Sequence, residues 1–506
     1  MTKPTTAIAA SINRSKERSL TIAILAVAVG LGLTLPLAMN STGAIGLIIG
    51  AGIGAALCAI MWSARRLPIL PILCVALPAT FFFRFEINLF PAFTEYGAAW
   101  GLNVSLQLIF SVMLCGAYWI ERRGKQRLRQ PFPVFFAVTA GMLWFWAAVS
   151  VAYGKEKWLG ICGLWMLASC LLLAVVLSTH FSSQRRLQTI LTVIAVGLII
   201  NGLVSFAQYK LGSIAILRLI GGVPEEWQQS IGEGEVPRAA GLIQSANAFA
   251  WLLVSLLPLF VAQLLLRSAE LRWRDKIMYA AAVLFGGIGL ILSFARGSWG
   301  SFAFAIVIVV ALSWWVMPAA QRRALTVKLL GIGLLLGVMS LPFAGLIVTR
   351  LTEDDRGSAE SRLTMAHIAS QIIKAYPLVG IGVNSYESEM ARFDDTSDFI
   401  TSWFPYPVHN IYLHIAGESG LPGLACFLLL IGWSFWRAFR VLRSASLFYQ
   451  TIIIGIIAGL IAFLLTGTKE PSALGSSTFR TLFLLFGLLL AVERASQTDA
   501  EAIHAE

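Results

Sequence analysis

Long apolar runs recur from one end of this 506-residue chain to the other, and they limit what it can fold into. A helix that crosses the hydrocarbon core of a bilayer needs about 20 consecutive apolar residues. Hydrophobic residues make up 58% of the sequence and charged residues only 13%, whereas a soluble domain carries about a quarter charged residues. Alternating strand patterns of the barrel type are absent, so the sequence predicts an all-α, polytopic integral membrane protein.

The apolar runs predict about fourteen transmembrane helices, within a range of twelve to fourteen. The third run is short and contains Pro68, Pro71 and Pro78, so it is expected to be broken or re-entrant. The first run could be a cleavable signal peptide, but its length and the span that follows at once favour a retained first helix. The predicted spans are 20–39, 44–63, 67–83, 98–120, 131–152, 158–179, 187–209, 241–266, 277–295, 299–317, 325–347, 409–436, 446–466 and 476–492.

The basic residues predict the orientation of these spans. If the N-terminus is cytoplasmic, every inside loop carries at least two Lys or Arg residues, as the positive-inside rule requires. This pattern accounts for the net charge of +12 without a nucleic-acid partner. The six cysteines are scattered through apolar runs without a Cys-x-x-Cys pair, which is typical of small buried side chains.

Two outside loops are long, at 210–240 and 348–408. The segment 359–375 has apolar residues at helical spacing and precedes Pro377, so we expect an amphipathic helix on the outer membrane surface. The organisation predicted is an N-terminal transmembrane bundle at 1–209, a core at 210–436 and C-terminal helices with a short cytoplasmic tail at 437–506. No internal repeat supports an inverted-repeat transporter.

Three arginines are predicted at the outer membrane edge. Arg296 lies in Ser-Phe-Ala-Arg-Gly-Ser-Trp-Gly between two spans, Arg238 directly precedes a span, and Arg362 lies on the amphipathic segment. A guanidinium near hydrocarbon needs an anionic partner, and its fork of donors fits phosphate. The three would suit a lipid pyrophosphate. The alternatives are snorkelling to the interface and ion pairs with acidic loop residues, namely Glu233, Glu235, Asp354 or Glu360.

His409 is the candidate for proton transfer. It lies in Pro-Tyr-Pro-Val-His-Asn, where a proline-rich loop enters a span, and imidazole exchanges protons near neutral pH. A structural role is the alternative. His414 is five residues on and about 140° round a helix, so the two histidines form a poor metal site. The pairs Asp354-Asp355 and Asp394-Asp395 are interpreted as solvated loop charge, and the sequence predicts no metal and no cofactor.

Four motifs in order resemble the O-antigen ligase and polymerase superfamily, over about residues 238–423. They are the Arg-x-x-Gly-x-x-x-x-x-Asn stretch from Arg238, Ser-Phe-Ala-Arg-Gly-Ser-Trp-Gly at 293–300, Tyr-Pro-Leu-Val-Gly-Ile-Gly-Val-Asn-Ser-Tyr at 376–386, and His-Asn-Ile-Tyr-Leu-His-Ile-Ala-Gly-Glu-Ser-Gly-Leu-Pro-Gly at 409–423. No P-loop or Gly-x-Ser-x-Gly is present, so ATP-driven transport and serine hydrolysis gain no support.

The resemblance implies a multi-pass glycosyltransferase of the bacterial inner membrane that acts at the periplasmic face without a metal. Its donor would be a glycan on undecaprenyl pyrophosphate, and a single displacement would invert the anomeric centre. Arg238 and Arg296 match the arginines expected to hold the pyrophosphate, and His409 matches the expected base. The acceptor would be lipid A–core in a ligase, another lipid-linked repeat in a polymerase of O-antigen or exopolysaccharide, or a protein hydroxyl.

Departures from the family pattern leave these alternatives open. Simple ligases are expected to have about twelve spans, so fourteen weakens a ligase relative to a polymerase. A large soluble C-terminal domain, common among the protein-glycosylating members, has no counterpart in the polar residues 493–506.

A transporter or flippase of lipid-linked sugars is the alternative from another class. Its path would need charges within the bilayer, whereas the predicted spans are nearly charge-free.

Overall fold

The structure is a computed structural model. It describes residues 69–84, 86–90, 101–122, 134–211, 228–231, 234–243, 245–318, 322–341, 344–352, 358–470 and 476–505. The predicted spans at 20–39 and 44–63 lie outside the described residues.

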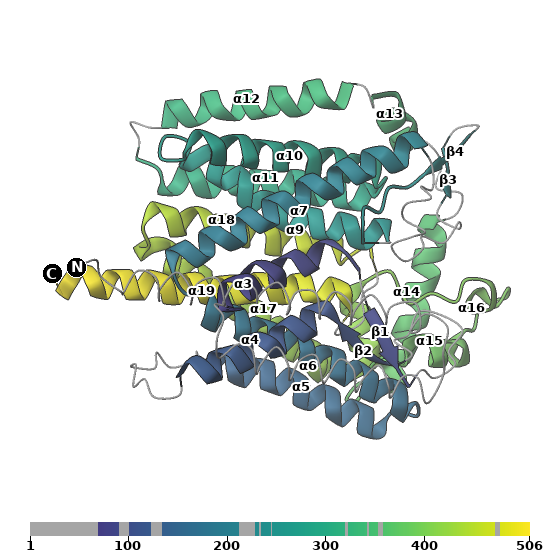
Figure 1. The fold of residues 1–506 in the computed structure, drawn as a ribbon. Coiled ribbons are helices and arrows are strands. Elements are labelled where there is room, and N and C mark those ends of the chain that lie inside the picture. Colours follow the sequence, from purple (N-terminus) through teal and green to yellow (C-terminus); the bar gives the residue numbers. More distant parts are fainter. Residues whose placement is uncertain are drawn as a thin grey trace, which may run out of the picture.

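Long helices run side by side and form a bundle (Figure 1). Within the described part of the chain, eight helices are long and apolar enough to cross a membrane. This supports an all-α polytopic membrane protein, although it does not support the predicted count of fourteen. The eight are α5 (Val134–Tyr153), α6 (Lys157–His180), α7 (Gln184–Leu211), α9 (Ala246–Leu266), α10 (Trp273–Leu292), α11 (Arg296–Val316), α17 (Ile411–Ser444) and α18 (Leu447–Thr466).

Shorter or more polar helices occupy the other predicted spans. Within the described residues, the third predicted span corresponds to α3 (Ile69–Ala79), which contains Pro78 and continues as the 3₁₀ turn η1 (Thr80–Phe82). The α-helix ends one residue after Pro78, and proline removes a helical hydrogen bond. The remaining spans correspond to α4 (Leu106–Arg122), α12 (Arg322–Ser340) and α19 (Ser477–Ala505).

Helix α9 lies at the centre of the bundle, where almost every side chain along it is buried. It packs against α18 at two glycines: a Cβ on Gly455 would lie 2.5 Å from the Cα of Leu259, and one on Gly459 would lie 2.2 Å from the Ser255 carbonyl oxygen. Small residues allow helices in a membrane to approach this closely. At its first turn, the Ser245 hydroxyl accepts a hydrogen bond from the Ala248 amide and caps α9.

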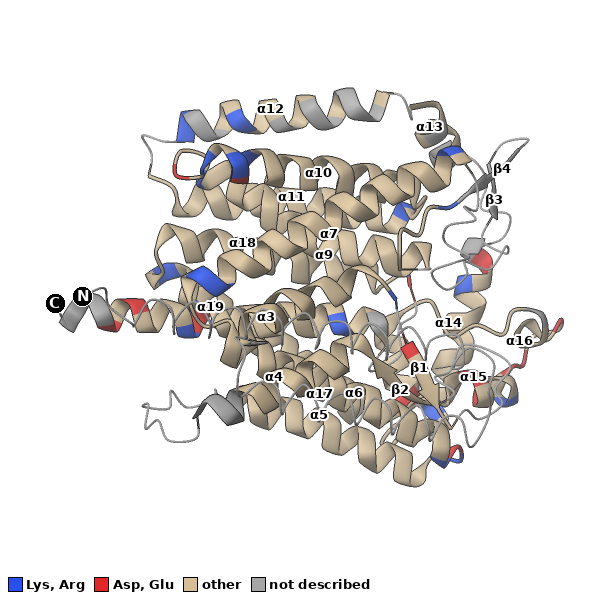
Figure 2. Cartoon of the chain, viewed as in Figure 1, with Lys and Arg blue, Asp and Glu red and all other residues tan. Residues whose placement is uncertain are grey.

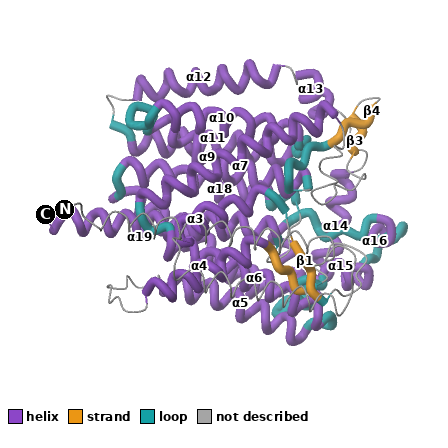
Figure 3. Tube along the Cα trace, viewed as in Figure 1, coloured by secondary structure: helices purple, strands orange, loops and turns teal. Residues whose placement is uncertain are grey.

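Among the described residues, the connections at one end of the bundle contain short strands, which the sequence did not predict (Figure 3). Strand β1 (Glu86–Leu89) pairs antiparallel with β2 (Leu102–Ser105), and β3 (Gln228–Ile231) pairs with β4 (Gly234–Pro237). Helices α13 (Ala344–Thr352), α14 (Ser358–Ala375), α15 (Tyr386–Glu389) and α16 (Ile400–Trp403) lie at the same end, here called the hairpin end. Figure 2 shows many of the described Lys and Arg residues at the opposite end, near the starts of α10 and α12.

The predicted helix in the long loop is present as α14, and it ends at Ala375, before Pro377. The expectation that it lies on the membrane surface is wrong for its apolar face. Met365, Ile368 and Ile372 are fully buried in a second hydrophobic cluster that also contains Tyr386. Burial against protein removes these side chains from water as effectively as lipid would.

Helix α17 is interrupted at Gly420, which has a φ of 70° and a ψ of 176°. This region of backbone space is essentially restricted to glycine. The chain after α14 lies against the interruption: the Leu421 amide donates to the Pro377 carbonyl at 2.8 Å, and the Gly382 amide donates to the Glu418 carbonyl at 3.0 Å. The third and fourth sequence motifs therefore form one backbone junction.

Candidate active site

A chain of hydrogen bonds at the hairpin end joins Arg238 to Glu470. Arg238 follows β4, and its Nε donates to the Ser293 carbonyl at 2.9 Å while its Nη2 donates to the Asn247 Oδ1 at 2.5 Å. Asn247 lies in the first turn of α9, and its Nδ2 donates to the Glu470 Oε2 at 2.7 Å. The asparagine amide therefore orients both the guanidinium and the carboxylate.

Glu470 lies in the turn that follows α18. Burial raises the pKa of this carboxyl to about 7, against the opposing charges of Arg238 and Arg362. A raised pKa of this kind is typical of a carboxyl withdrawn from water. At neutral pH the group is therefore divided between its charged and its protonated form.

His409 lies two residues before α17, and the Asn410 side chain caps that helix by accepting from the Tyr412 and Leu413 amides. The Phe404 ring stacks on the imidazole with centroids 5.8 Å apart. Burial and the positive charge of Arg362 together lower the pKa of His409 to about 4. The imidazole is therefore neutral at physiological pH and able to accept a proton.

Arg362, on α14, supplies a positive charge that lies near both Glu470 and His409. It acts electrostatically on both Glu470 and His409. The α14 helix packs against α17, which brings the guanidinium to the head of α17. The sequence predicted that a surface helix would carry Arg362, whereas the structure places it on a helix that packs against α17.

Arg296 begins α11, directly after a tight turn in which Phe294 has a φ of 53°. The Ser293 carbonyl of the same turn accepts the hydrogen bond from Arg238. A Cβ on the neighbouring Gly297 would lie 3.1 Å from the Lys469 Cδ. The backbone at Arg296 therefore lies beside both the Arg238 side chain and the turn that carries Glu470.

The structure thus places Arg238 and Arg362 near Glu470, and Arg362 also near His409, with the start of α11 beside Arg238. This group is called the arginine cluster below. The sequence analysis missed the role of Asn247, and it missed Glu470 altogether. Its only signal was Lys-Glu-Pro directly after an apolar run. Of the expected counterions, the side chains of Glu233, Glu235 and Asp354 lie outside the described residues.

His414 lies away from the cluster, as the helical spacing predicted. Its Nε2 is 3.4 Å from the Glu418 Oε1, and its ring meets the Tyr386 ring edge to face at 5.0 Å. Both residues of the pair are buried. His414 therefore belongs to the contact between α15 and α17.

The prediction of solvated charge is wrong for Asp394. This side chain is buried, and its carboxylate accepts hydrogen bonds from the amides of Thr396 and Thr401 at 3.1 and 2.8 Å. It also accepts from the hydroxyls of both threonines. Asp395 is exposed, as predicted, and pairs with His367 at 3.2 Å. The local sequence does not separate these two roles because both aspartates stand in the same polar run.

A family model described as O-Antigen ligase matches residues 281–428. The matched segment contains Arg296, Arg362 and His409, while Arg238 lies upstream of it and Glu470 downstream. Such a family indicates a glycosyltransferase-like membrane enzyme with lipid-linked glycan substrates. Over this segment, the chain is similar to the O-antigen ligase family, and the match supports the O-antigen ligase and polymerase superfamily.

Proposed function

We propose that this protein is an inverting, metal-independent glycan transferase. It moves a polysaccharide or repeat unit from undecaprenyl pyrophosphate to an acceptor hydroxyl at the periplasmic face of the bacterial inner membrane. The observation that carries the proposal is the arginine cluster, in which Arg238 and Arg362 surround Glu470 and Arg362 also acts on His409. Convergent guanidiniums beside a proton acceptor are the groups that this reaction needs.

The arginines hold the diphosphate. Breaking the bond between the anomeric carbon and the diphosphate oxygen increases the negative charge on the leaving group, and fixed donors stabilise that charge as it develops. Arg238 is already oriented by Ser293 and Asn247, so little reorganisation is needed. Arg296 adds a further guanidinium at a helix N-terminus, where the helix dipole also favours anions.

Glu470 regulates the charge of this site. Its carboxylate would repel a diphosphate, but with a pKa of about 7 it takes up a proton at little cost. The protonated carboxyl keeps its place in the hydrogen-bonded chain through Asn247, while the arginines face the diphosphate without an opposing charge on Glu470.

His409 accepts the proton of the attacking hydroxyl. A pKa of about 4 makes it a weak base in the free protein. A diphosphate bound to Arg362 would offset the charge that lowers this pKa, so donor binding would strengthen the base. The acceptor oxygen then bonds to the anomeric carbon, its proton passes to the imidazole, and undecaprenyl pyrophosphate leaves.

The family leaves two candidate acceptors. They are lipid A–core for a ligase and a second lipid-linked repeat for a polymerase.

The proposed orientation is supported by the basic residues at the end opposite the hairpin end, such as Arg272 and Arg322 at the starts of α10 and α12. By the positive-inside rule that end is cytoplasmic. Membrane lipids surround the apolar helices in either case.

The test uses the purified full chain in lipid nanodiscs, with an undecaprenyl-pyrophosphate glycan and either acceptor, in EDTA and without nucleotide. We expect a transferred glycan of inverted anomeric configuration with one acceptor only, and this acceptor distinguishes ligase from polymerase. Failure with both acceptors, together with movement of the donor across proteoliposome membranes, would replace the proposal with a flippase.

A further inference from the structure

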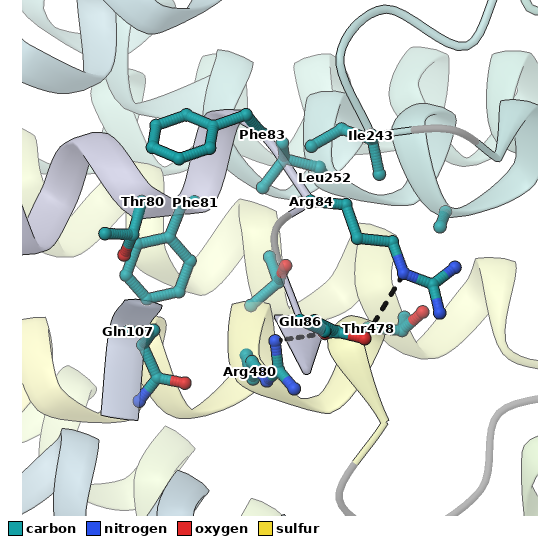
Figure 4. Close-up of a pocket in the computed structure, with 12 residues that line it drawn as sticks. Thr80, Phe81, Phe83, Arg84, Glu86, Gln107, Ile243, Leu252, Thr478 and Arg480 are labelled. Carbon is teal, nitrogen blue, oxygen red and sulfur yellow. Dashed lines mark hydrogen bonds and ion pairs between the residues drawn. The ribbon is translucent and has the colours of Figure 1, made fainter. Parts of the chain in front are cut away.

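A small cavity with both polar and apolar lining residues lies at the hairpin end (Figure 4). It is enclosed by η1, β1 and the first turns of α4, α9 and α19, and its volume is about 40 Å³. One water molecule needs about 10–15 Å³ by the same measure, so the cavity admits more than a single water. We call it the Arg84 pocket.

Two buried polar atoms in its wall lack a protein partner. Arg480 donates from its two Nη atoms to Glu86 and Asn103. Among the described residues, however, neither its Nε nor the Oε1 of Gln107 has a hydrogen-bond partner. Gln107 is 3% exposed and Arg480 9%. An unpaired buried polar atom is costly, so a donor and an acceptor stand ready in this wall for the polar atoms of a ligand.

Arg84 lies at the mouth of the pocket. Its side chain is 47% exposed, and its Nε is 3.2 Å from the Glu86 Oε2. Burial alone would raise the pKa of Glu86, but Arg480 and Arg84 hold it below its usual value, so the carboxylate is charged. The guanidiniums of Arg84 and Arg480 carry two positive charges and the Glu86 carboxylate one negative charge, so this wall has a net charge of about +1.

The opposite wall is apolar. Its apolar lining residues are Phe81, Phe83, Ile243 and Leu252, which stand around the polar side chains (Figure 4). A pocket with an apolar wall and a few placed polar groups is typical of specific small-molecule sites. A sugar ring has both surfaces, because its C–H face packs on apolar side chains while its hydroxyls bond to amide and guanidinium groups. The charged wall disfavours a lipid chain.

The Arg84 pocket and the arginine cluster share the start of α9. Ala248 lines the pocket, and the preceding residue, Asn247, donates to Glu470 in the cluster. The Arg84 amide also donates to the Leu242 carbonyl at 3.1 Å, in the segment that follows Arg238. A ligand in the pocket is therefore separated from the cluster by the first turn of one helix.

We infer that the Arg84 pocket admits the edge of one sugar ring of the acceptor glycan, with Gln107 and Arg480 meeting hydroxyls on that edge and Arg84 an anionic substituent, while the rest of the ring stays outside the cavity. The identification of the sugar as the acceptor rests on the proposed function, whereas the binding of a sugar in the pocket does not. The predicted ligand is a saccharide unit, and either lipid A–core or a lipid-linked repeat could supply it.

The first test measures transfer with Arg84→Ala and Gln107→Leu, varying the acceptor at saturating donor and then the donor at saturating acceptor. We expect the acceptor KM to rise about tenfold and the donor KM to stay within twofold. The matched control is Arg392→Ala, which removes another exposed guanidinium at the hairpin end, paired with Glu389. An unchanged acceptor KM in both variants, or an effect on the donor KM alone, would overturn the inference.

The second test needs no activity, so it separates failure of the pocket from failure of the proposed function. In the full chain, Phe83→Cys is alkylated with a membrane-impermeant maleimide in the presence of deacylated core oligosaccharide or of a free repeat-unit oligosaccharide. Slower labelling with either sugar supports the pocket and identifies the source, while Arg392→Cys should be labelled at the same rate throughout. Protection by neither sugar at millimolar concentration refutes the inference even if the protein transfers glycans.

Discussion

Arg238 and Glu470 are separated by 232 residues in the chain and joined by one side-chain amide in the fold. Asn247 accepts from the Arg238 Nη2 at 2.5 Å and donates to the Glu470 Oε2 at 2.7 Å. The charge that the arginines present to a ligand therefore depends on whether Glu470 carries a proton. This dependence distinguishes the site from a simple row of basic residues.

Glu470→Gln should strengthen donor binding and remove its pH dependence. The wild-type carboxyl, with a pKa of about 7, is charged above that pH and neutral below it, so affinity for a diphosphate diester should fall as the pH rises from 6 to 8.5. Glutamine is uncharged throughout. We expect about tenfold tighter binding than wild type at pH 8.5, roughly 1.4 kcal/mol, and similar affinities at pH 6. Competition with a fluorescent polyprenyl diphosphate measures both, and equal pH slopes would refute the role of Glu470.

His409→Ala should abolish turnover and preserve donor binding. Loss of a positioned base commonly lowers the rate by about 10² to 10⁴, while the arginines that hold the diphosphate remain. Because the pKa of His409 is about 4 in the free protein and donor binding should raise it, kcat/KM should fall only near pH 4, whereas kcat for the donor complex should fall at a higher pH. The control is His367→Ala, since His367 is exposed and pairs with Asp395. Single-turnover rates with matched donor Kd values check the prediction.

Arg296→Lys should weaken donor binding by about tenfold although the charge is kept. A lysine presents a point charge, whereas a guanidinium presents a planar fork that matches phosphate oxygens. Arg392→Lys is the matched control, because that side chain pairs with Glu389 in the long loop. Equal donor Kd values for wild type and Arg296→Lys would show that Arg296 contributes only long-range charge.

Gly420→Ala should prevent the backbone junction between α17 and the segment after α14. A Cβ at Gly420 would lie 2.1 Å from the Leu378 carbonyl oxygen, and its φ of 70° disfavours any side chain. This region of backbone space costs about 1–3 kcal/mol for a non-glycine residue, and the overlap adds about 1–3 kcal/mol. Gly300→Ala is the control, since a Cβ there meets no atom within 4 Å. Thermal unfolding in detergent should show a large loss for Gly420→Ala and none for Gly300→Ala.

Asp394→Asn should loosen the long loop. Burial alone would raise the pKa of Asp394, but hydrogen bonds from Thr396 and Thr401 hold it below its usual value. The carboxylate therefore stabilises the fold above its unfolded-state pKa, and this contribution is lost as the pH falls through the lower folded-state pKa. The substitution should cost about 1–3 kcal/mol at neutral pH and speed proteolysis between α15 and α17. Asp395→Asn, at an exposed site, should have no such effect.

The bundle was largely predictable, because the length and composition of an apolar run are local properties. The run at 158–179 became α6 within one residue at each end, and the helix at 359–375 became α14. The predicted arginines also reached the same end of the bundle, since charge near a span end locates the membrane edge.

The pairings were not predictable, because they join distant parts of the chain. Asn247 and Glu470 are 223 residues apart, and Arg480 reaches Glu86 across 394. Asp394 and Asp395 are neighbours in the same polar stretch, yet only Asp394 is buried. The β1–β2 hairpin has too few residues for its alternation to stand out from the surrounding loop.

The placement of the cluster has a consequence for how the protein can vary. Its members stand at the starts of α9 and α11, before α17, on α14 and after α18, all on one side of the bundle. The lengths of these helices can therefore adapt to bilayers of different thickness without moving the reacting groups apart. Substitutions that match the helices to bilayer thickness and substitutions in the proposed active site would then affect different residues.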